Sequence, residues 1–155
     1  MPYSSIDRMI WDDPWFRSLP ARTKLLWLYA WSNSRVNPAC CYRIVLDDMA
    51  RATGFDGQGD PDFDTALEAL ADHMTYFPAG YLWVHGFVHH QTGSPHYLQG
   101  VKKCLERELP PEIARRVMEH NAQRGIFIPY EDRIHTVVKP ADTVLAAADT
   151  VSSTS

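Results

Sequence analysis

This 155-residue chain lacks any apolar stretch approaching the ~20 residues that a membrane-spanning helix requires. Its first residues, MPYSS, also lack the basic region and apolar region of a secretory signal peptide. We therefore expect a cytoplasmic protein without a membrane partner. The length is typical of about one domain, and an apolar content of 45 % is sufficient for a core.

Cysteine is scarce, and its spacing argues against a disulfide framework. The chain has three cysteines, the adjacent Cys40 and Cys41 together with Cys104. No base can be placed beside the pair, so we expect buried, unreactive thiols rather than a nucleophile. The chain also lacks a CxxC or HExxH motif, a glycine-rich phosphate loop, a paired-carboxylate site and a Ser-His-Asp pattern. We expect no enzyme activity, no cofactor and no small-molecule substrate.

The charge is unevenly distributed along the chain. The net charge is −4, so the molecule as a whole does not attract nucleic acid. Residues 46–80 contain eight acidic side chains and a single basic one, Arg51, whereas the segments 1–45 and 81–124 are mildly basic. The middle of the chain is thus an acidic block between two mildly basic ones.

Hydrophobic periodicity and turn residues predict a mainly helical chain with a small β-hairpin, which is the α+β class. Ser18 is expected to cap the first helix, and Gly54 and the pair Asp60-Pro61 mark an end and a start. The turn of the hairpin is expected at residues 78–80, with residues 87–88 extending its second strand. The expected helices cover residues 19–32, 46–53, 60–74, 95–109 and 111–124, and the expected strands cover residues 41–45 and 75–84.

This order of elements is typical of a winged helix-turn-helix, with additional helices at its C-terminal side. We expect a winged-helix domain at residues 1–109, a helical extension packed on it at 110–134, and a flexible tail at 135–155. The last segment has few large apolar residues and ends in TVSSTS.

Two stretches resemble a known family. They are WDDPWFRSL at residues 11–19, and GYLWVHGF at residues 80–87 followed by His90, Gln91 and the helix over 95–109. They are similar to phage replication-organiser proteins and to the N-terminal winged-helix domain of DnaD-type primosomal proteins. The resemblance covers about residues 9–109. It implies DNA binding, oligomerisation and a role in assembling replication proteins at a phage or prophage origin.

The helix predicted at residues 60–74 has an acidic exposed face without Arg or Lys, so it is unsuited to approach phosphates. We expect other basic residues to contact the DNA backbone, and aromatic residues of the hairpin to contact bases or sugars. The alternative for the basic residues is that they are scattered solubilising charges, and the alternative for the aromatic residues is that they pack the hairpin onto its domain. The candidates are Arg43, Arg51, Tyr81, Trp83, Lys102, Lys103, Arg107, Arg115 and Arg116.

Two other hypotheses belong to different classes. In the first, the domain is a protein-binding or self-associating module that uses the acidic helix (Asp64, Glu68 and Asp72) or the Trp-rich segment 11–16 (Trp11 and Trp15). In the second, a metal-dependent enzyme uses the histidines between residues 85 and 96. Their spacing does not match a tetrahedral zinc site, so we expect no metal.

Overall fold

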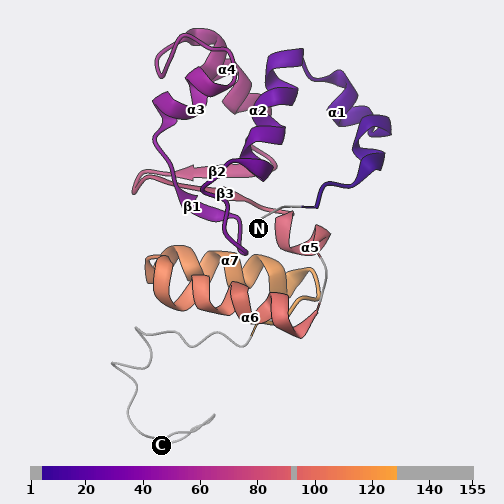
Figure 1. The fold of residues 1–155 in the computed structure, drawn as a ribbon, viewed down its shortest axis with the longest axis vertical. Coiled ribbons are helices and arrows are strands. Elements are labelled where there is room, and N and C mark those ends of the chain that lie inside the picture. The colour runs from indigo at the N-terminus through magenta and orange to yellow at the C-terminus, as the bar shows by residue number, and fades with distance from the viewer. Residues whose placement is uncertain (1–4, 92–93, 129–155) are drawn as a thin grey trace, which may run out of the picture.

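A three-stranded antiparallel sheet lies between two groups of helices (Figure 1). The computed structural model describes residues 5–91 and 94–128. The N-terminal elements are η1 (Arg8–Asp12), α1 (Pro14–Ser18), α2 (Ala21–Ser32), β1 (Cys41–Arg43), α3 (Leu46–Ala52) and α4 (Pro61–Ala69). They are followed by β2 (Met74–Phe77), β3 (Tyr81–Val84), α5 (Phe87–His90), α6 (Pro95–Lys103), η2 (Cys104–Glu108) and α7 (Pro111–Gln123). No helix in these described ranges has the length and apolar character needed to cross a membrane.

The central strand β3 is buried on both faces of the sheet. The strand order is β1–β3–β2, with Leu82 of β3 opposite Tyr42 on one side and Tyr76 on the other. Side chains alternate along a strand, so Leu82 and Val84 enter the core beneath α1–α4, while Tyr81 and Trp83 enter the core beneath α6 and α7. The sheet therefore serves as a shared wall between two hydrophobic cores.

The β2–β3 hairpin is confirmed, with its turn at residues 78–80. The backbone N–H of Gly80 donates to the carbonyl of Phe77 at 2.9 Å. Gly80 has φ +94°, a conformation that glycine adopts without a steric penalty. This turn fixes the register in which Phe77 lies opposite Tyr81.

Several predicted helix ends agree with the structure. Asp60 caps α4 by accepting from the N–H of Asp62 at 2.9 Å, and Gly54 follows α3 with φ +90°. The predicted helix 95–109 is observed as α6, which continues through η2 as one π-helical turn. α7 matches the predicted helix over 111–124 to within a residue.

Three boundaries were predicted wrongly. Ser18 does not cap α2; it ends α1, and its hydroxyl donates to the carbonyl of Trp15 at 2.6 Å. The acidic helix ends at Ala69 rather than at Met74, because Met74 pairs with Val84 in the sheet. Residues 87–88 belong to α5 instead of extending β3.

The predicted domain border at 109/110 does not coincide with a gap in the structure. Leu105 and Leu109, before the border, share one core with Ile113 and Val117, after it. α6, η2 and α7 thus form one layer on the sheet (Figure 1). Residues 129–155, which include the predicted tail, lie outside the described residues.

Two neighbouring leucines of α2 test this assignment of the core. Leu26 is fully buried, whereas Leu25 is 49 % exposed. We expect Leu26→Ala to lower the free energy of unfolding by about 3 kcal/mol, because it leaves a cavity in the core. Leu25→Ala should change it by less than about 0.5 kcal/mol. Urea unfolding of both variants checks this, and equal losses would show that α2 packs through a different face.

Candidate nucleic-acid interface

A groove of about 500 Å³ runs along the outer edge of β1, beside the turn of the hairpin. Arg35 and Arg43 line it together with Tyr81 and Glu108. Asn37 satisfies the backbone at this edge, because its side-chain amide donates to the carbonyl of Cys41 at 2.7 Å and accepts from the N–H of Cys41 at 3.1 Å. The groove therefore has a fixed polar wall and two guanidinium groups.

Local structure positions both arginines. Asn33 accepts from the backbone N–H of Arg35 at 2.9 Å, which holds the turn after α2. Arg43 ends β1, and its guanidinium carbon lies 5.5 Å from the centre of the Tyr81 ring. Stacking on an aromatic face leaves the edge of a guanidinium group free to donate hydrogen bonds.

A third guanidinium group lies over the other strand of the hairpin, against the ring of Phe77. The guanidinium carbon of Arg116, on α7, is 5.2 Å from the centre of the Phe77 ring and 5.8 Å from that of Trp83. Phe77 and Tyr81 are the paired residues that flank the turn. Arg43 and Arg116 therefore stack on the two rings beside the turn of the same hairpin.

The arginines of the groove are not neutralised by salt bridges within the described residues. The ion pairs found there are Arg22–Asp62, Arg51–Asp47 and Lys102–Glu106. Glu108 also faces the groove, where it accepts from the side chain of Asn37 at 3.2 Å. Two positive charges against one negative leave the groove with a positive balance.

The basic residues predicted on α6, η2 and α7 have different surroundings. Lys102 is half-buried and paired with Glu106 at 3.2 Å, whereas Lys103 and Arg107 are exposed. Arg115 is half-buried, and Arg116 is committed to the hairpin rings. Lys103, Arg107 and Arg116 are thus the exposed members of this set, and Arg116 is the one that its contact with aromatic rings orients.

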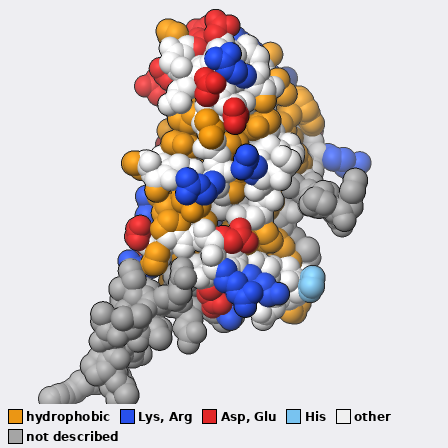
Figure 2. Space-filling view, turned by 60° about the vertical axis from the view of Figure 1, so that its left-hand side comes forward, with side chains coloured by type: hydrophobic (Ala, Val, Ile, Leu, Met, Phe, Trp, Pro, Cys, Tyr) orange, Lys and Arg blue, Asp and Glu red, His pale blue; other side chains and the backbone are white. Residues whose placement is uncertain are grey.

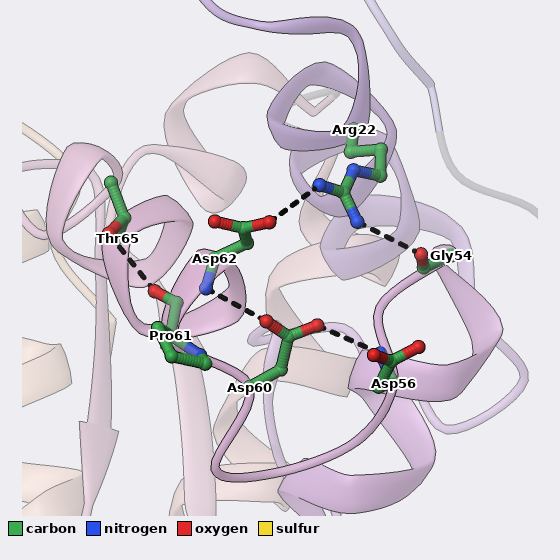
Figure 3. Close-up of polar contacts among 7 residues, drawn as sticks. All are labelled: Arg22, Gly54, Asp56, Asp60, Pro61, Asp62 and Thr65. Carbon is green, nitrogen blue, oxygen red and sulfur yellow. Dashed lines mark hydrogen bonds and ion pairs between the residues drawn. The ribbon is translucent and has the colours of Figure 1, made fainter.

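The region of α3 and α4 is acidic, as the sequence indicated. Arg51 is held by Asp47 at 2.8 Å, and Asp47 also accepts from the N–H of Gln58. Figure 3 shows Asp60 bonded to two backbone N–H groups and Asp62 bonded to Arg22. Arg51 is therefore engaged within this acidic region and does not join the groove.

The remaining acidic candidates are exposed. Asp64 and Glu68 lie on the outer face of α4, and Asp72 lies in the turn after it rather than on the helix. Figure 2 shows acidic side chains crowded at the top of the molecule, at the height of α3 and α4 in Figure 1. Separate groups of Lys and Arg lie lower, at the height of the sheet and of α6 and α7.

The structure corrects the prediction that Tyr81 and Trp83 present their rings to bases. Both side chains are buried in the second core, because α6 and α7 cover the face of the sheet on which they lie. Neither ring can stack on a base without displacing that layer. Tyr81 contributes to the groove through its edge, and its hydroxyl donates to the carbonyl of Glu108 at 3.4 Å.

The two Trp candidates of the N-terminal segment differ. Trp11 is 58 % exposed and meets the edge of Phe16, with ring centres 5.2 Å apart. Trp15 is half-buried against Trp27 and His73. Trp11 therefore remains available to a partner, and Trp15 forms part of an aromatic pocket.

The cysteines are buried, as predicted. Burial raises the pKa of Cys41 and of Cys104 to about 12, and it raises that of Cys40 as well. All three are free thiols. They are packing residues of the two cores rather than nucleophiles.

The histidines do not converge on one point. His85 packs against Trp83 and His120, while His89 and His90 are neighbours on α5. Within residues 5–91 and 94–128 there is no group of three or more His, Cys, Asp or Glu side chains that could hold a metal ion.

Arg35 was missed by sequence reasoning. It lies in the loop between α2 and β1, where no periodic pattern assigns a side chain to a face. The available signal was a basic residue in the loop that leads to the predicted strand 41–45.

Comparison with known proteins does not assign the site. No protein-family model, curated protein or solved structure matches this chain. The resemblance to replication-organiser proteins therefore stays a prediction, and the function is argued from the geometry of the groove and the hairpin.

His85 provides a pH test of the packing between the sheet and α7. Burial, together with the neighbouring His120, lowers the pKa of His85 from 6.5 to about 4. Between these two values the unfolded chain binds the extra proton, so stability should fall as the pH is lowered through this window. Urea midpoints at several pH values should show this fall.

The matched variant is His85→Gln, which keeps a polar side chain near the Thr75 hydroxyl, 2.7 Å from Nε2 in the wild type. It should flatten the pH dependence without abolishing it, since burial also lowers the pKa of His73, His90 and His120. An unchanged slope would show that His85 is not responsible.

Proposed function

We propose that this protein is a winged-helix module that binds nucleic acid through phosphate contacts at the β1 edge and beside the hairpin turn. Two features support the winged-helix assignment. The first is the succession of α2, β1, α3, α4 and the β2–β3 hairpin, and the second is the strand order β1–β3–β2. In this assignment the hairpin is the wing and α4 is the helix that would read the major groove.

The observation that carries the proposal is the placement of Arg35, Arg43 and Arg116 around the turn end of the wing. Arg35 and Arg43 share the groove, and Arg43 and Arg116 stack on Tyr81 and Phe77. Guanidinium groups held by aromatic rings are oriented before they bind, and their planar fork matches phosphate oxygens. Exposed Lys103 and Arg107 extend the positive charge beyond the groove.

The mode of binding follows from the charge of α4. Its outer face carries Asp62, Asp64 and Glu68, which repel a phosphate backbone. Base-edge readout by this helix is disfavoured, so binding is weakly sequence-specific and strongly salt-dependent. Together with the resemblance seen in the sequence, this supports a role in organising DNA for replication in a phage or prophage.

A second function is favoured by the acidic face itself. Asp64 and Glu68 are exposed and unpaired within the described residues, so they are free to meet a basic partner protein or a second copy of the chain. In that case the winged helix is an adaptor, and it does not bind DNA even at low salt.

A salt titration of duplex binding tests the proposed function. Each phosphate contact adds about 0.9 to the slope of log K against log salt, so Arg35→Gln/Arg43→Gln should make that slope shallower by about 2. The control, Arg8→Gln/Arg17→Gln, removes two exposed charges from the N-terminal elements and should leave the slope unchanged. Lys103→Gln/Arg107→Gln measures the contribution of α6 and η2.

Equal effects of the groove pair and the control pair would show that charge acts without a defined site. Absence of binding by the wild-type protein at low salt would contradict the proposal and favour the adaptor.

A further inference from the structure

The side of the molecule formed by η1, α1, α2 and α5 contains a second concave site, an aromatic pocket of about 240 Å³. Trp15, Trp27 and Trp31 form its walls with His73 and His90, and it shares no lining residue with the groove. Neighbouring Trp rings meet at steep angles, 89° between Trp15 and Trp27 and 73° between Trp27 and Trp31. The pocket is thus walled by rings set edge to face.

A buried hydrogen-bond donor in the pocket wall has no partner. Trp31 is 7 % exposed, and its indole Nε1 is buried without a hydrogen-bond partner in the described chain. The nitrogen is closed off from the pocket opening, so Trp31 offers an occupant its ring rather than its N–H.

The charge at the pocket is negative. Asp7 and Asp13 line it, and each uses one carboxylate oxygen to cap the following helix. The two histidines do not compensate, because burial lowers the pKa of His73 and of His90. A phosphate is repelled here, whereas a cationic group is attracted.

The rim is apolar and exposed. Met9 is 63 % exposed, and η1 has no buried residue. Ser5 and Gln91 tie this segment to the end of α5 by reciprocal hydrogen bonds of 3.2 and 2.9 Å. The rim formed by η1 is therefore held beside the pocket while Met9 stays open to an occupant.

We propose that this pocket binds a peptide segment of a partner protein that presents a large apolar side chain next to a basic one. The apolar side chain enters between the Trp rings, and the basic group meets Asp7 and Asp13. Such a segment matches the aromatic walls and the charge together. The proposal is independent of the nucleic-acid function.

The test uses the unlabelled peptide acetyl-Arg-Leu-Phe-Arg-amide and nitrogen-15-labelled full-length protein. The indole N–H resonance of Trp31, assigned with Trp31→Phe, reports on the pocket wall. We expect a saturable shift, since an occupant changes the surroundings of this ring. The acidic match, acetyl-Glu-Leu-Phe-Glu-amide, should leave the resonance in place.

Three variants separate charge from structure. Asp7→Asn/Asp13→Asn keeps both helix caps, since Asn caps as well as Asp, and it should weaken peptide binding about three- to tenfold. Asp12→Asn removes a charge from the same segment outside the pocket and should leave binding unchanged. Trp31→Phe should weaken binding about two- to tenfold through loss of aromatic contact area.

The proposal is overturned if the basic peptide leaves the Trp31 resonance unmoved at millimolar concentrations, or if the acidic peptide binds equally well. It is also overturned if duplex DNA produces the shift, or if protein dilution alone does so, because the occupant is then nucleic acid or a second copy. Failure of Trp31→Phe to fold leaves the aspartate variants to decide.

Discussion

The burial of strand β3 on both faces is the constraint on which the rest of the structure depends. Tyr81, Leu82, Trp83 and Val84 are all buried, and consecutive residues face opposite cores. A strand with one face in water alternates between apolar and polar residues, whereas one covered on both sides is apolar throughout. The sequence YLWV therefore requires a helical layer on each face of a very small sheet.

This constraint decides which surfaces remain for binding. The layer of α6 and α7 removes Tyr81 and Trp83 from solvent. What is left around the β2–β3 hairpin is its polar surround, where Arg43 and Arg116 stack on rings that belong to the second core. The packing of β3 thus places the cations even though it removes the aromatic rings from the surface.

Three surfaces of the molecule differ in charge and therefore suit different kinds of partner. A positive groove lies beside the hairpin turn, and the outer face of α4 is acidic. The pocket of Trp15, Trp27 and Trp31 is aromatic and has two carboxylates. The groove and the pocket share no lining residue, so the two binding events that we propose would not compete for one site.

Much of the local structure could be predicted from the sequence, because its signals are local. Asp60-Pro61 starts α4, Gly54 follows α3, and the residues around Gly80 form the hairpin turn. The end of α4 could not be predicted, since Met74 continues the helical stripe by spacing but gains more from pairing with Val84. Tertiary pairing overrides local periodicity at that point.

The candidate site was predictable only in part, for the same reason. The acidic character of α4 follows from composition alone, and Arg43 was predicted as a basic residue on the strand beside the helix-turn-helix. The burial of Trp83 depends on where α6 and α7 pack, and the contribution of Arg35 depends on how a loop folds beside β1. Both are long-range consequences that no spacing in the sequence encodes.

The most direct test of the central claim is to map backbone amide resonances of the full chain with a short DNA duplex at low salt. The account predicts the largest shifts at residues 34–43 and 77–81, around the groove and the hairpin turn, and little change at residues 61–69. Shifts centred on α4, or none at all, would contradict it.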